Sequence, residues 1–263
     1  MPVYKAEGVV LGRRNLGEAD RVLTLFTREF GRLQAKAKAV RRTTSRLAGR
    51  LEPFTHASFL LARGKAVDVV AQVEVVEGHG QLRADLRRLG YGWLVAELVA
   101  QLVPEGEPHP EVFGLLVETL RLLEHADPAL AAVWCGLRLF GQLGYRPSTD
   151  RCPVCGRPPA PRDVWSPRFG GFTCGPCASE DPRAARLGGE AAGAARFLLQ
   201  ASAQEAGHLR VSASASGRLV AAVVAYAEAR ADRPLRSARI VQALEGPGPQ
   251  ETDGRRRREQ EGA

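Results

Sequence analysis

Short hydrophobic runs fill the first 80 residues of the chain, and their composition favours strands over helices. The runs are rich in β-branched and aromatic residues and are separated by turn residues, of which Glu29, Phe30 and Gly31 form one set. The pattern predicts five short strands, one around Val9 and Leu11 and the others at residues 21–27, 32–40, 54–62 and 66–76.

The third of these segments alternates regularly between apolar and polar residues, so that its two faces differ. The apolar face consists of Leu33, Ala35, Ala37 and Ala39. The polar face consists of Arg32, Gln34, Lys36 and Lys38. One face can therefore be buried while the other presents a row of cations. Five strands with one long loop at residues 43–53 fit a small antiparallel barrel such as the oligonucleotide-binding (OB) fold.

Beyond Gly80 the hydrophobic period becomes helical. Apolar residues recur at helical spacing in residues 94–102, 112–123, 189–203 and 219–227. Asp127 before Pro128 is typical of a helix start and predicts a helix to about Gly144. We therefore expect an OB-fold domain at residues 1–80 and an all-helical domain at residues 81–245. Residues 246–263 carry four consecutive arginines and no apolar cluster, and we expect a disordered basic tail.

Positive charge is concentrated near the N-terminus. The chain of 263 residues has a formal net charge of +8, and residues 28–50 hold eight basic residues against a single acid, Glu29. Such a window indicates an anionic partner, although a basic surface can also serve only solubility. The predicted contacts to nucleic acid are Arg32, Lys36, Lys38, Arg41, Arg42, Arg46 and Arg50, with Arg13, Arg14 and Lys65 as extensions of the patch.

Four cysteines form two Cys-x-x-Cys pairs, Cys152 with Cys155 and Cys174 with Cys177. Two such turns can supply the tetrahedral thiolate shell of a structural Zn²⁺, which leaves no open position for catalysis. Two disulfides or redox-active pairs are the alternative, but nothing in the sequence suggests an oxidising compartment. We predict one structural Zn²⁺ per chain, in an element at about residues 150–180 that interrupts the helical domain. The fifth cysteine, Cys135, lies in an apolar helical pattern and is expected to be buried.

Several classes of protein are disfavoured by the sequence. No apolar run approaches the length of a membrane span, and the N-terminus lacks the order of a signal peptide, so we expect a soluble cytoplasmic protein. There is no phosphate-binding glycine-rich loop and no carboxylate cluster for Mg²⁺, and the five histidines are scattered. We therefore expect neither an enzyme nor a small-molecule substrate. The aromatic residues Tyr4, Phe26, Phe30, Phe54 and Phe59 fit a barrel core better than a base-stacking surface.

Four stretches of the chain resemble the RecO family of bacterial recombination mediators. They are residues 16–32 (LGEADRVLTLFTREFGR), 51–54 (LEPF), 139–147 (LFGQLGYRP) and 233–237 (RPLRS), in the same order as in the family. The first is the most specific, and together they span about residues 1–245. All four zinc cysteines of the family are present, and the arginine-rich tail is a departure.

The resemblance implies an N-terminal OB-fold, a helical domain with an inserted zinc element, and a role without catalysis. That role is to bind single- and double-stranded DNA without sequence specificity, anneal complementary strands, and help load recombinase onto DNA coated with single-strand-binding protein. The implied partners are RecR and the acidic C-terminal tail of single-strand-binding protein. The implied location of the protein is the nucleoid. Arg121 and Arg138, on helices beside leucines, are candidates for that tail.

Two alternatives stay open at this point. The protein could be an adaptor that assembles repair proteins, with DNA contact incidental. A barrel with a zinc ribbon would also suit an RNA-binding protein or a transcription factor.

Overall fold

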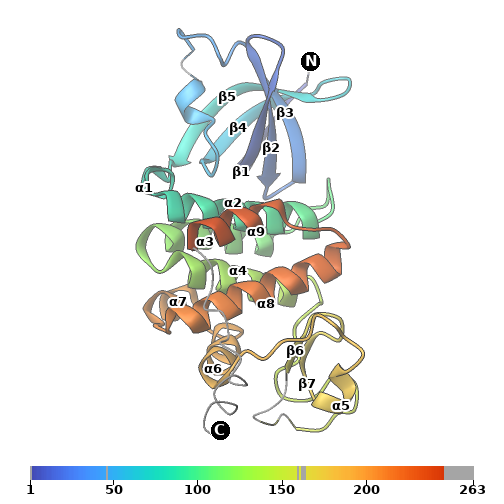
Figure 1. The fold of residues 1–263 in the computed structure, drawn as a ribbon. Coiled ribbons are helices and arrows are strands. Elements are labelled where there is room, and N and C mark those ends of the chain that lie inside the picture. The colour runs from blue at the N-terminus through green and yellow to red at the C-terminus, as the bar shows by residue number, and fades with distance from the viewer. Residues whose placement is uncertain (1, 46, 159, 161–163, 246–263) are drawn as a thin grey trace, which may run out of the picture.

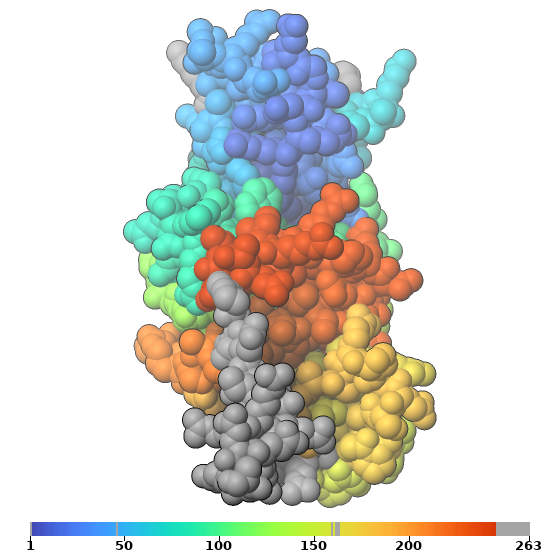
Figure 2. All heavy atoms as spheres, viewed as in Figure 1, coloured from blue at the N-terminus to red at the C-terminus, as the bar shows by residue number. Residues whose placement is uncertain are grey.

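The computed structural model describes residues 2–45, 47–158, 160 and 164–245. A five-stranded barrel lies at one end of the elongated molecule, the helices occupy the middle, and a small hairpin with a short helix lies at the other end (Figure 1). The space-filling view shows the same separation of the barrel from the hairpin region (Figure 2). The two predicted sites therefore lie far apart.

The barrel strands are β1 (Val3–Leu16), β2 (Asp20–Thr27), β3 (Gly31–Ala37), β4 (His56–Ala62) and β5 (Asp68–Glu77), which confirms the predicted five-stranded, OB-like barrel. They close in the order β1-β2-β3-β5-β4. Four neighbouring pairs are antiparallel, as expected. The closing pair, β3 with β5, is parallel and short, with Ala35 opposite Asp68 and Lys36 opposite Val69. The short helix η1 (Ala48–Arg50) lies in the loop that follows β3.

The third strand is shorter than its alternating pattern predicts. It ends at Ala37, because Ala39 adopts a left-handed backbone conformation with φ of 53°. The Ala39 amide donates to the Asp20 carboxylate at 2.8 Å, which holds the turn against the start of β2. Val40, which the alternation would place outside, is fully buried. The prediction that Ala39 continues the apolar face is therefore wrong, since a turn replaces the strand there.

The main helices are α2 (Leu86–Leu102), α3 (Pro110–His125), α4 (Pro128–Gln142), α6 (Gly189–Leu198) and α8 (Ala213–Ala231), and they confirm the helical pattern. As predicted, Asp127 caps α4: its carboxylate accepts from the Ala129 and Leu130 amides. The sequence pattern did not indicate α1 (Gly80–Ala84), α7 (Ala203–His208) or α9 (Arg236–Glu245). None of the helices in the described ranges combines the length and hydrophobicity that crossing a membrane requires.

The barrel and the helices share a continuous core. Phe26 and Phe54 of the barrel are fully buried with helical residues in one cluster. The Phe54 ring lies edge-on to Trp93, with centroids 5.1 Å apart. Gly31 has a φ of +62°, and a side chain there would collide with the carbonyl oxygen of Glu107, so the turn before β3 can approach the segment between α2 and α3 closely.

Polar side-chain contacts also join the two parts. Arg121 on α3 donates to both carboxylate oxygens of Glu77 at the end of β5, with Nε 2.8 Å from Oε2. His79, which precedes α1 and is almost completely buried, lies 2.9 Å from Glu124. These contacts satisfy polar groups that the joint would otherwise leave without partners.

Candidate metal centre and nucleic-acid interface

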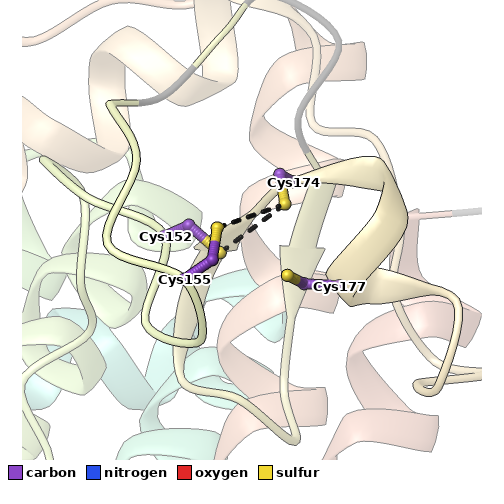
Figure 3. A group of neighbouring side chains, drawn as sticks. All are labelled: Cys152, Cys155, Cys174 and Cys177. Atoms are coloured by element: carbon purple, nitrogen blue, oxygen red, sulfur yellow. Dashed lines mark hydrogen bonds between the residues drawn. The ribbon is translucent and has the colours of Figure 1, made fainter.

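The four paired cysteines come from two loops that the fold brings face to face (Figure 3). Cys152 and Cys155 lie in the loop after α4, where Gly156 donates to the Cys152 carbonyl at 2.9 Å and turns the chain back. Cys174 follows β7 (Gly171–Thr173), and Cys177 lies in α5 (Gly175–Ala178). β7 pairs with β6 (Val164–Ser166), so a hairpin positions the second pair.

The spacing of the sulfur atoms fits a metal ion. All four lie within 4.8 Å of one another, and Cys174 Sγ is 3.8 Å from Cys152 Sγ and 3.7 Å from Cys155 Sγ. Tetrahedral coordination at a Zn–S distance of about 2.3 Å places sulfur atoms about 3.8 Å apart. A disulfide would instead bring two sulfurs to about 2.05 Å. The four thiols therefore form a centre suited to a metal, and the disulfide alternative does not describe this arrangement.

The electrostatics of the cluster favour loss of a first proton. The hydrogen bond from the Arg157 side chain and those from Cys177 lower the pKa of Cys174 to about 6. The hydrogen bond to Cys174, together with burial, raises the pKa of Cys177 to about 12, because both favour the protonated thiol. A divalent cation would replace these protons and allow all four thiols to bind it as thiolates.

The hydrogen bonds of Asp181 brace the hairpin beside the cysteines. Its carboxylate accepts from the Ser166 hydroxyl and from the Arg168 amide at 3.1 Å. Trp165 is buried against Phe172 in an edge-to-face contact. Cys135, in contrast, lies fully buried within α4, where burial raises the pKa of its thiol to about 11. As expected, it takes no part in the cluster.

The predicted nucleic-acid residues gather mainly at the end of the barrel far from the helices. Arg41 links two loops there: its side chain donates to the Gly17 carbonyl at 2.9 Å and its amide to the Ala19 carbonyl at 2.9 Å. Arg14, Lys38, Arg41 and Arg42 are all exposed. Within the described part of the chain, none of these four forms an ion pair. We call these four residues the distal cluster.

Three other predicted residues have carboxylate partners inside the protein. Lys36 Nζ lies 2.8 Å from Asp20, and Arg32 lies 3.6 Å from Glu105 in the segment between α2 and α3. Arg13 pairs with Glu52. These neighbours offset part of the charge that the sequence places on the barrel.

The remaining predicted residues lie elsewhere on the barrel. Arg50, at the end of η1, donates to the Val73 carbonyl at 3.5 Å. Lys65 is exposed in the turn between β4 and β5. Arg46 lies outside the described residues.

One basic residue of this region was missed. Arg21 on β2 lies 3.8 Å from Glu52, and burial, together with the positive charges of Arg13 and Arg41, lowers its pKa. It begins the run at residues 21–27 and therefore lies outside the basic window at residues 28–50.

The two residues predicted to bind a partner's acidic tail differ in their surroundings. The Arg121 guanidinium is occupied by the bidentate ion pair with Glu77 described above. Arg138 on α4 is half-buried and donates to the Leu199 carbonyl at 3.4 Å. Arg138 therefore keeps more of its charge available than Arg121 does.

Comparison with known proteins agrees with this architecture. The family model "Recombination protein O N terminal" matches residues 1–79, and "Recombination protein O C terminal" matches residues 83–239. Proteins named DNA repair protein RecO are similar to the chain. The one from Desulfitobacterium hafniense strain Y51 is 38% identical over 241 residues, which cover 90% of this chain and 88% of that protein.

Two further relatives carry the same name. The Pelotomaculum thermopropionicum protein is 45% identical over 177 residues, which cover 67% of this chain and 69% of that protein. The Symbiobacterium thermophilum protein is 34% identical over 251 residues, which cover 93% of this chain and 98% of that protein. With both family models matched in order over nearly the whole described chain, the protein belongs to the RecO family of DNA repair and recombination proteins.

Proposed function

We propose that this protein is a recombination mediator that binds single- and double-stranded DNA without sequence specificity. In this role it anneals complementary strands and assists the loading of recombinase onto DNA coated with single-strand-binding protein. The observation that carries the proposal is the distal cluster, because its exposed cations lack carboxylate partners within the described residues. Membership of the RecO family supports the same role.

The chemistry of the distal cluster suits annealing. Cations at the end of β1 and in the segment after β3 can contact backbone phosphates and release counterions, which gives affinity without reading bases. Base edges then stay free to pair with a second strand. Neutralising phosphates of both strands also lowers the repulsion that opposes their approach. Lys36, Arg50, Lys65 and the other predicted basic residues would extend this path along the barrel.

We propose Zn²⁺ as the metal of the four-cysteine centre, with one ion per chain. A full set of sulfur ligands at tetrahedral spacing is typical of structural zinc, and it leaves no position for a reacting water. The ion would fasten the loop after α4 to the β6–β7 hairpin, so its role is structural.

The proposal extends to organisation and partners. Residues 1–80 would form the DNA-binding domain and residues 81–245 the helical domain, with residues 246–263 as a basic tail that lies outside the described residues. RecR and the acidic C-terminal tail of single-strand-binding protein are the proposed protein partners. Arg138 is the better candidate for that tail, since Glu77 occupies Arg121. We propose a cytoplasmic location at the nucleoid and a role without catalysis.

An adaptor with incidental DNA contact is the second candidate. It is favoured by the internal pairing of Arg13, Arg32 and Lys36, which reduces the charge available to DNA. The adaptor should keep its biological activity when its affinity for DNA is removed.

The test compares two double charge reversals that change the net charge equally. We expect Arg41→Glu/Arg42→Glu to weaken binding to single-stranded oligonucleotides at least tenfold and to slow annealing in parallel. The control, Arg210→Glu/Arg239→Glu, reverses two exposed arginines of the helical domain and should leave both activities near the wild-type level. Unchanged annealing in the first variant would contradict the mediator proposal, and repair in cells that survives complete loss of DNA binding would favour the adaptor.

A further inference from the structure

Two aromatic residues of the barrel differ from the others in being only partly buried. Phe26, Phe54 and Phe59 are completely inaccessible to solvent, as a core role requires. Tyr4 on β1 and Phe30 in the turn before β3 pack at the margin of the barrel core and keep part of their surface exposed. Their rings meet edge to face with centroids 4.8 Å apart. This pair therefore occupies the border between core and surface.

Arg63 covers this pair with a planar cation. Its guanidinium carbon lies 4.4 Å from the centroid of the Tyr4 ring and 6.0 Å from that of Phe30. The residue is exposed, and no ion pair involves it within the described ranges. A guanidinium held against one aromatic face by cation–π attraction presents its other face outward, where a further flat group can stack.

The surroundings hold these groups in place. The Tyr4 hydroxyl donates to the Asp68 carboxylate, which also accepts from the Gly64 amide at 3.0 Å. The Arg63 amide donates to the Pro2 carbonyl at 3.0 Å, so both ends of the hairpin turn are anchored. The turn between β4 and β5 projects from the side of the barrel (Figure 2). Because the rings and the backbone are already fixed, stacking on them would require little further ordering.

The charge around this group also suits nucleic acid. Lys5 is exposed on β1 next to Tyr4, and Lys65 is exposed two residues beyond Arg63. Neither has an ion-pair partner in the described part of the chain. The Asp68 carboxylate accepts hydrogen bonds from Tyr4 and Gly64, which occupy its oxygens. Lys65, in the same turn as Arg63, would supply a cation for the phosphates of a nucleotide whose base stacks on Arg63.

We propose that Tyr4, Phe30 and Arg63 form a platform on which an unpaired base of single-stranded nucleic acid stacks. The platform rests on the proposed DNA-binding function and adds a preference for single strands over duplexes, which phosphate contacts alone do not provide. Base stacking requires an exposed base face, so duplex DNA, whose bases are already stacked, cannot use the platform. The barrel would therefore hold phosphates through its lysines and arginines and distinguish single strands through Arg63.

The test uses the full chain and a single-stranded oligonucleotide with one 2-aminopurine, whose fluorescence falls when it stacks. Wild-type protein should quench this signal on binding. We expect Arg63→Lys, which keeps the charge but removes the planar group, to weaken single-strand binding about fivefold and to relieve the quenching. Duplex affinity should change less than twofold. Tyr4→Phe keeps the ring and is the matched control for Tyr4→Leu, which should behave like Arg63→Lys.

The outcomes separate the platform from the proposed function. If Arg63→Lys changes neither affinity nor quenching while Arg41→Glu/Arg42→Glu abolishes binding, the aromatic pair serves only the core and the platform is refuted. Equal losses for single strands and duplexes would also refute it, since a phosphate contact would then explain both. A thermal midpoint near the wild-type value is required of each variant, and Arg63→Lys alone decides the matter if Tyr4→Leu does not fold.

Discussion

The metal centre and the distal cluster are both sets of like residues that the fold brings together, but they differ in what surrounds them. The four thiols lie within 4.8 Å of one another, so their spacing defines a ligand shell. The cations of the barrel lie among carboxylates, and Asp20, Glu52 and Glu105 each engage one or more of them. The comparison teaches that spacing alone can indicate a metal site, whereas the charge available to DNA depends on which cations stay unpaired.

The largest effect should come from removing one metal ligand. Cys174→Ser should abolish metal binding and lower the thermal midpoint sharply, because structural zinc contributes on the order of 10 kcal/mol to folding. Cys135→Ala removes the buried fifth cysteine and should retain one metal per chain. Metal content by mass spectrometry and melting curves measure both effects. A metal-free Cys174→Ser protein that melts like wild type would show that the cluster does not stabilise the fold.

A smaller effect should follow from loss of a carboxylate at the joint between barrel and helices. Burial acts to raise the pKa of Glu124, but hydrogen bonds from His79 and two backbone amides outweigh it and hold the pKa below its usual value. Because the folded-state pKa is lowered, this stabilisation is present above the unfolded pKa of about 4.3 and is lost as the pH falls.

Glu124→Gln should therefore cost about 1–2 kcal/mol at neutral pH, and its unfolding free energy should decline less than that of wild type between about pH 5 and 3. Glu118→Gln changes an exposed residue of the same helix and serves as the control. Chemical denaturation across this pH range measures both variants. Parallel pH profiles for wild type and Glu124→Gln would contradict this assignment.

The smallest effect should come from releasing a paired cation. Hydrogen bonds from Lys36 and the Ala39 amide lower the pKa of Asp20. Asp20→Asn can still accept from that amide but no longer neutralises Lys36, so single-strand affinity should rise about twofold and its salt dependence should steepen. Glu74→Gln, which changes an exposed acid elsewhere on the barrel, should change the salt dependence less. Fluorescence anisotropy measures both variants. A lower affinity for Asp20→Asn than for wild type would contradict the view that Asp20 reduces the charge that Lys36 offers to DNA.

Local patterns predicted the elements of this fold better than their contacts. The cysteine spacing indicated the metal centre, since each pair is built by its own turn. The hydrophobic periods indicated the strands of the barrel and most of the long helices. The helix α9 was not predicted, because its few apolar residues, among them Val241, are buried against α2, which is remote in sequence.

The nucleic-acid residues show the limit of a local charge count. Arg32 pairs with Glu105 and Arg13 pairs with Glu52. In both cases the partner is remote in sequence, so the residues around the arginine do not indicate it. The left-handed turn at Ala39 likewise depends on Asp20, which lies on another strand. Such partners are defined only when the barrel closes.

The most direct test of the comparison is the salt dependence of single-strand binding for two variants that remove the same charge. Arg41→Gln/Arg42→Gln removes cations without carboxylate partners, and Arg13→Gln/Arg32→Gln removes cations that have them. We predict that the first variant makes the log–log slope shallower by about 1.4, at about 0.7 per phosphate contact, and that the second changes it by less than half as much. Equal changes in the two slopes would contradict the account, because internal pairing would then have no bearing on which cations meet DNA.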